Sequence, residues 1–128
     1  DSEFILQTHS TNPLLGKNTI LDAIEIFYSN YPKHESLFSV TSLQMRFWER
    51  GPRPINHNPS ELLRTQDLKP MYFENSSIYI FNRNKFLKIN NRIGKNPKMF
   101  EMSKIESFDI DDMDDFKLAE TLEKNLNK

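Results

Sequence analysis

The first 44 residues alternate strand-like and helix-like patterns, and this order constrains the fold more than any other feature. "EFILQT" (residues 3–8) sets apolar residues in a row, as in a buried parallel strand. After a polar loop, Thr19 and Asp22 can cap a helix. The apolar stripe of that helix has helical spacing: Ile20, Ile24, Phe27 and Tyr31. A second strand follows at residues 36–44, so we predict a β-α-β unit and a mostly parallel, doubly wound sheet.

Residues 45–70 interrupt this alternation. Three prolines there cannot lie in a central strand: Pro52, Pro54 and Pro59. We therefore predict an arm or hairpin that leaves the sheet. Phe47 and Trp48 at the start of this arm would be exposed and would need a partner surface.

The remaining chain returns to regular patterns. Residues 76–81 alternate as a strand, "RNKFLKINN" predicts a short helix ending near Gly94, and "KMFEM" (residues 98–102) predicts another strand. A last helix begins near Asp112 and is expected to bury residues at helical spacing: Phe116, Ala119, Leu122 and Leu126. We expect residues 1–128 to form a single domain with the arm inside it.

Composition excludes several classes of function. The net charge of −1 provides no global field for nucleic acid or an anionic membrane. There are no cysteines, which excludes disulfides, thiolate zinc sites and thiol nucleophiles and suits the cytoplasm. No apolar run is long enough to span a bilayer, and no signal-peptide pattern is present. We therefore expect a cytoplasmic protein that binds neither nucleic acid nor a membrane.

Five aspartates crowd into the seven residues "DIDDMDD" (109–115). Asp109 and Asp111 would point to the same side of an extended segment, and two carboxylates side by side suit Mg²⁺. Alternatively, the cluster caps the last helix, because the positive end of the helix dipole favours anions. The residues alone leave both interpretations open.

Several segments, in this order, resemble a known family: "QTHSTNPL", "LFSVTSLQMRFW", "RTQDLKPMYFENSSIYIF", "NRIGKNPKMFEM" and "FDIDDMDDFKLAE". Together they look like the C-terminal half of the N-acylneuraminate cytidylyltransferases, which activate nonulosonic acids such as sialic acid with CTP. The resemblance implies a Rossmann-like nucleotidyltransferase sheet. The glycine- and lysine-containing phosphate loop of that family has no counterpart here, so the chain resembles only the second half of the expected domain.

The resemblance also implies roles for individual residues. It assigns Asp109 and Asp111 to Mg²⁺, and leaves Asp112, Asp114 and Asp115 for the helix end. It assigns five residues to the sugar acid: Gln7, Arg64, Gln66, Asn75 and Tyr79.

Near two of these positions, the sequence departs from the pattern of the family. Arg64 could hold the carboxylate bidentately, although Thr65 stands where relatives can carry a second arginine. Ser76 replaces the usual glycine beside Asn75, and Tyr79 could equally be a core residue.

Two hypotheses follow for the function. In the first, the chain is the sugar-acid- and metal-binding half of an enzyme that transfers CMP from CTP to a nonulosonic acid and releases pyrophosphate, and it is inactive alone. Octulosonate cytidylyltransferases are a related possibility. In the second, it is a non-catalytic interaction or dimerisation module. The resemblance implies a homodimer formed through the arm.

Overall fold

The structure is a computed structural model that describes residues 2–126, so residues 1, 127 and 128 of the predicted domain lie outside the described part. The chain divides into two compact units. One combines the residues up to Thr41 with those from Glu74 onward, and we call it the sheet unit. The other is Ser42–Phe73, which we call the insert. Each is described by itself.

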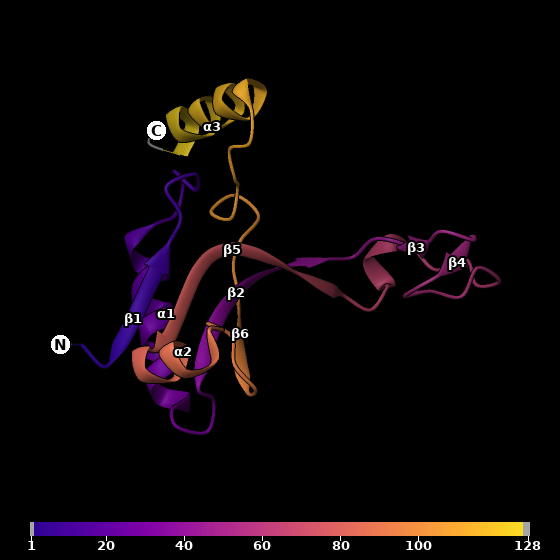
Figure 1. Cartoon of the computed structure of the whole chain (residues 1–128). Helices are drawn as coiled ribbons and strands as arrows, with labels where there is room; N and C mark the ends of the chain where they lie inside the picture. The colour runs from indigo at the N-terminus through magenta and orange to yellow at the C-terminus, as the bar shows by residue number, and fades with distance from the viewer. Residues whose placement is uncertain (1, 127–128) are drawn as a thin grey trace. The chain divides into compact units, whose positions relative to one another are not determined.

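A four-stranded sheet has the strand order β1-β5-β2-β6 (Figure 1). The strands are β1 (Phe4–Thr8), β2 (Ser36–Leu43), β5 (Met71–Asn82) and β6 (Pro97–Glu101). Strands β2 and β6 pair in parallel, whereas β1 and β5 pair antiparallel. The predicted α/β class with a central sheet is confirmed. The prediction that β1 is a buried parallel strand is wrong, because β1 lies at one end of the sheet and pairs antiparallel with β5.

Helix α1 (Lys17–Asn30) packs on the sheet and supplies Ala23 and Phe27 to the core. The sheet side of this core consists of Leu37, Ile78, Ile80, Phe100 and Met102. The predicted stripe of α1 is confirmed, since Ile20, Ile24 and Tyr31 pack against the same cluster. Phe4 of β1 meets Phe27 and Tyr31 edge-on, with ring centroids 5.3 and 5.0 Å apart.

The start of α1 is capped from a distant part of the chain. Gly16 is the N-cap residue and has no side chain to offer, so the expected capping by Thr19 and Asp22 is wrong. Instead, the Glu106 carboxylate accepts hydrogen bonds from Gly16 N at 2.9 Å and Thr19 Oγ1 at 2.7 Å. A Cβ on Gly16 would lie 2.7 Å from Glu106 Oε1, so any other residue would require the Glu106 carboxylate to shift.

Replacing Glu106 with Ala should lower the free energy of unfolding by about 1–2 kcal/mol, because the first turn of α1 loses its acceptor. Thermal unfolding measures the change. Glu25→Ala is the matched control, since Glu25 is exposed on the same helix. Equal melting temperatures for the two variants would show that the Glu106 contact does not stabilise α1.

Helix α2 (Arg83–Ile89) ends earlier than expected. Asn90, with φ 49° and ψ 42°, adopts the left-handed conformation that terminates it, so the helix does not extend to the neighbourhood of Gly94. Asn82 caps its start by accepting a hydrogen bond from Lys85 N at 3.1 Å.

Helix α3 (Met113–Leu126) begins where the sequence predicts but buries less. Ala119 is buried, whereas Phe116 and Leu126 are 52% and 56% exposed, so their expected burial is wrong. Phe116 and Ala119 of α3 line a pocket together with Pro13, Leu14 and Ile110. Within residues 2–126, no helix is both long enough and apolar enough to cross a membrane.

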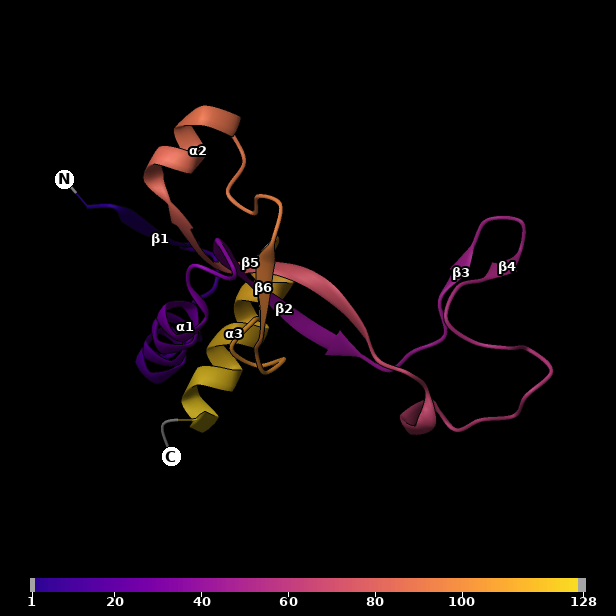
Figure 2. The same ribbon diagram turned by 90° about the horizontal axis from the view of Figure 1, so that it is seen from below.

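The insert contains a short antiparallel pair, β3 (Trp48–Glu49) with β4 (Arg53–Pro54), and a 3₁₀ turn, η1 (Thr65–Asp67) (Figure 2). Trp48 is 48% exposed and packs edge-on against His57, with ring centroids 4.7 Å apart. Leu68 is buried.

Candidate functional site

Gln7 and Tyr79 are direct partners in the β1–β5 ladder, so the structure brings two of the predicted substrate residues together. A third side chain joins them. Arg92 Nη1 donates to Gln7 Oε1 at 3.1 Å, and the guanidinium carbon of Arg92 lies 3.7 Å from the centroid of the Tyr79 ring. Sequence reasoning missed Arg92, because nothing in the local sequence distinguishes it from any other loop arginine.

Tyr79 is fully buried, and its hydroxyl donates to the Glu74 carboxylate and lies 3.1 Å from Ser76 Oγ. Burial, followed by the hydrogen bond to Glu74, raises the pKa of the Tyr79 hydroxyl above its ordinary value of 10.0. The residue therefore contributes to the core and also presents a ring face to Arg92.

Raising the pH through about 10 should lower the free energy of unfolding, because the phenol of Tyr79 ionises more readily in the unfolded chain than in the folded one. The raised folded pKa means that this contribution is complete below pH 10 and is lost above it. Denaturant titrations between pH 8 and 11 should show a weaker pH dependence for Tyr79→Phe than for wild type. Tyr28→Phe, which removes a hydroxyl group at an exposed position, is the matched control.

Asn75 is buried, and its side chain is occupied inside the sheet unit. Its Oδ1 accepts from Ser39 Oγ at 2.5 Å and Ser77 N at 3.1 Å, and its Nδ2 donates to Thr41 Oγ1 at 2.9 Å. These contacts position the start of the buried part of β5.

The next residue, Ser76, has φ 60°, a conformation that favours glycine. This conformation agrees with the glycine that the family resemblance implies at this position.

The segment with Asp109 and Asp111 lies beside the loop that follows β1. Ile110 N donates to Thr11 O at 3.0 Å, and Asn12 Nδ2 donates to Phe108 O at 3.2 Å. Two segments that carry the family resemblance therefore lie together at the carboxyl end of β1. This is the edge where sheets of this type bind ligands.

Three of the five aspartates use their side chains for contacts at the start of α3. Asp112 Oδ1 accepts from the backbone N–H groups of Asp114 and Asp115, each at 2.9 Å, and Asp115 Oδ2 accepts from Asp111 N at 3.1 Å. Asp114 pairs with Lys117 at 3.2 Å. The start of α3 thus uses the three aspartates that the sequence analysis left for the helix end.

Asp109 and Asp111 retain free carboxylate oxygens. Oδ1 of Asp109 is buried with no hydrogen-bond partner among the described residues, and the exposed carboxylate of Asp111 forms no hydrogen bond or ion pair within residues 2–126. In the described part of the chain, no three side chains of the metal-binding types converge. Two free carboxylates nevertheless fit Mg²⁺, which takes one or two of them together with substrate phosphates.

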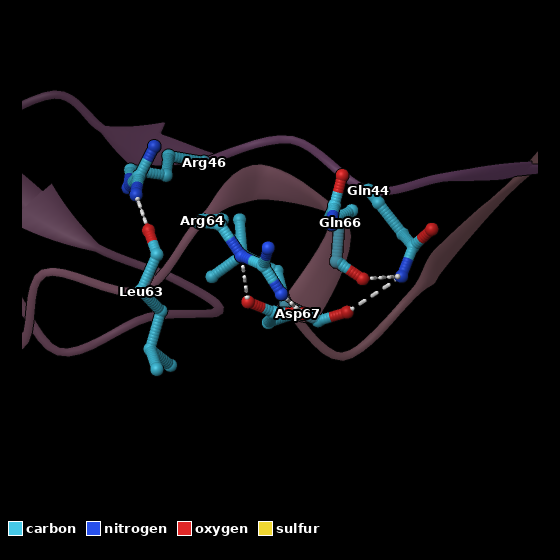
Figure 3. A network of polar contacts seen from close by, with 7 residues as sticks. Gln44, Arg46, Leu63, Arg64, Gln66 and Asp67 are labelled. Atoms are coloured by element: carbon cyan, nitrogen blue, oxygen red, sulfur yellow. Dashed lines mark hydrogen bonds and ion pairs between the residues drawn. The ribbon is translucent and has the colours of Figure 1, made fainter.

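Arg64 and Gln66 belong to the insert (Figure 3). The Arg64 side chain is 74% exposed, and its Nε and Nη2 donate to the two carboxylate oxygens of Asp67 at 2.7 and 3.2 Å. The backbone oxygen of Gln66 accepts a hydrogen bond from Gln44 Nε2 at 3.0 Å, and the side chain of Gln66 is exposed. The guanidinium of Arg64 is therefore already paired with the carboxylate of Asp67, three residues along the chain.

Comparison with known proteins identifies the family. A family model described as "Cytidylyltransferase" matches residues 1–127. The chain is 29% identical to the N-acylneuraminate cytidylyltransferase of Streptococcus agalactiae serotype V over 126 residues, which cover 91% of this chain and 29% of that protein. It is also 29% identical to the Post-translational flagellin modification protein B of Campylobacter coli, covering 95% of this chain and 54% of that protein.

A shorter match and a structural likeness agree with this. CMP-N,N'-diacetyllegionaminic acid synthase of Campylobacter jejuni is 42% identical over 57 residues, covering 44% of this chain and 24% of that protein. The crystal structure of 4-diphosphocytidyl-2C-methyl-D-erythritol synthase from Anaerococcus prevotii shares the fold, with TM-score 0.62 and 11% identity over 96% of this chain and 59% of that one. The chain spans less than a third of the streptococcal relative and about half of the Campylobacter coli relative. Because the family match runs over residues 1–127, the chain belongs to the cytidylyltransferase family.

Proposed function

We propose that this chain is the sugar-acid- and metal-binding half of a cytidylyltransferase that transfers CMP from CTP to a nonulosonic acid and releases pyrophosphate. One observation supports this above the others: the Asp109–Asp111 segment is hydrogen-bonded to the loop that follows β1, the strand that carries Gln7. The relatives named for N-acylneuraminate and legionaminic acid chemistry support the choice of acceptor class.

Residues of this chain would divide the work as follows. Gln7, near the carboxyl end of β1, would orient the sugar acid, and the buried Tyr79 opposite it on β5 would support the site from below. Asp109 and Asp111 would hold Mg²⁺, which when bound neutralises triphosphate charge and polarises the phosphorus under attack. Asn75 acts indirectly, because its side chain is committed to buried hydrogen bonds.

The test compares the chain alone with the chain joined to the nucleotide-binding half of a relative. Incubated with CTP, Mg²⁺ and a panel of sugar acids, the chain alone should release no pyrophosphate above blank, since its sequence contains no phosphate loop. The joined protein should release pyrophosphate with at least one nonulosonic acid, and the nucleotide-binding half alone is the control. Turnover by the isolated chain, or none by the joined protein with any acid, would overturn the proposal.

Exposed apolar side chains of the insert favour a second candidate, a dimerisation module. The insert exposes Met45, Trp48, Ile55, Leu62 and Leu63, with Leu62 fully exposed. Such a surface suits a symmetric contact with a second copy of the chain. Sedimentation should show a homodimer that Trp48→Ser weakens and Leu87→Ser, an exposed site on α2, leaves intact. A monomer at every accessible concentration would rule the dimer out.

A further inference from the structure

We propose that Arg92, and not Arg64, binds the carboxylate of the sugar acid; this inference rests on the proposed function. Arg92 follows α2 in a loop and is half-buried. It reaches two of the three predicted substrate residues of the sheet unit at once, through its hydrogen bond to Gln7 and its stacking on Tyr79. These two contacts come from different strands and hold the guanidinium plane in one orientation.

Most N–H groups of the Arg92 guanidinium have no hydrogen-bond acceptor among the described residues. One of its five N–H groups goes to Gln7, and within residues 2–126 it forms no ion pair. The Glu74 carboxylate, which also meets Tyr79, accepts from the Tyr79 hydroxyl and forms no ion pair with Arg92. A half-buried cation without a counter-ion is unfavourable, and an incoming carboxylate would supply that charge bidentately.

Arg64 lacks these properties. Its fork is engaged by Asp67, three residues along the chain, and its side chain is mostly exposed. A sugar acid would have to displace Asp67 before it could bind there, and an exposed arginine offers only a screened charge. Arg92 is therefore the stronger anchor, because its orientation is set before the ligand arrives.

This anchor predicts selectivity for the acid over neutral sugars. The carboxylate would lie against Arg92 at the carboxyl end of β1, with Gln7 close by to contact the remainder of the ligand. A ligand of the same shape without the negative charge would leave the guanidinium unpaired and gain nothing from it.

The experiment titrates the full 128-residue chain with N-acetylneuraminate and, separately, with its methyl ester, and measures Kd by calorimetry. Arg92→Gln should raise Kd for the acid by roughly ten- to hundredfold, because it removes a charged bidentate donor. Arg92→Lys keeps the charge but loses the bidentate geometry, so its Kd for the acid should lie between those of wild type and Arg92→Gln. Arg64→Gln is the matched control and should bind like wild type. The methyl ester should bind the wild-type chain as weakly as the acid binds Arg92→Gln.

Two-dimensional amide NMR spectra confirm that each variant is folded. If Arg92→Gln fails to fold, Arg92→Lys and the methyl ester still decide the question. Unchanged affinity in both Arg92 variants, an equal loss in Arg64→Gln, or no acid binding to the wild-type chain would overturn the inference. The proposed reaction is judged separately by pyrophosphate release from the joined protein, so the two failures are distinguishable.

Discussion

If the proposed function is correct, replacing Asp111 with Asn in the chain joined to the nucleotide-binding half of a relative should remove most of the pyrophosphate release while leaving the melting temperature almost unchanged. The Asp111 carboxylate is exposed and makes no hydrogen bond or ion pair within residues 2–126, so the amide keeps the volume and loses only the charge that the proposed Mg²⁺ site requires. We expect the rate to fall by at least the roughly ten- to hundredfold that losing an outer-shell partner costs a metal site. The magnesium concentration needed for half-maximal rate should rise as well.

Asp114→Asn is the matched control, because Asp114 lies three residues away in the first turn of α3 and pairs with Lys117. This variant should lose about 0.3–1 kcal/mol of stability through the helix dipole, with little effect on the rate. Both variants are measured for magnesium-dependent rate and for melting temperature. If Asp114 governs the rate and Asp111 only the melting temperature, the metal assignment is wrong and capping explains the whole cluster.

Replacing Asn75 with Ala should lower the free energy of unfolding by about 2–3 kcal/mol, because buried hydroxyl groups lose their partners. Ser39 Oγ donates to Asn75 Oδ1, and Thr41 Oγ1 accepts from Asn75 Nδ2, so the substitution leaves both with one contact fewer inside the sheet unit. Chemical unfolding monitored by circular dichroism measures the change. Asn84→Ala, at an exposed position of α2, is the control and should stay within about 0.5 kcal/mol of wild type.

The same variant decides between two roles for Asn75. The family resemblance assigns it to the sugar acid, whereas its hydrogen bonds place it in the internal network of β5 and β2. If Asn75→Ala keeps the wild-type stability and loses affinity for N-acetylneuraminate, the substrate role is correct and the structural one is not.

Features set by neighbouring residues were predictable from the sequence. The stripe of α1, the strands β2 and β6 and the start of α3 follow from periodicities of 3.6 and 2, which depend on residues a few positions apart. The aspartates that cap α3 belong to the same group, since Asp112 bonds to N–H groups two and three residues later.

Features that join distant segments were not predictable in this way. The cap of α1 comes from Glu106, 90 residues beyond Gly16, so the local residues Thr19 and Asp22 gave the wrong prediction. The apolar spacing of α3 correctly indicates a helix, yet burial depends on what covers its face, and Phe116 remains 52% exposed.

The sequence by itself determined the elements and, through its ordered segments, the resemblance to a family that the match over residues 1–127 then showed. The tertiary structure alone decided which arginine meets Gln7 and Tyr79. Arg64 lies three residues from Asp67, so a local pair occupies it. Arg92 lies 85 residues from Gln7, and their hydrogen bond forms only because β5 pairs antiparallel with β1 and sets Tyr79 opposite Gln7. Local spacing carries no information about such a contact, because strand register and loop path are properties of the whole fold.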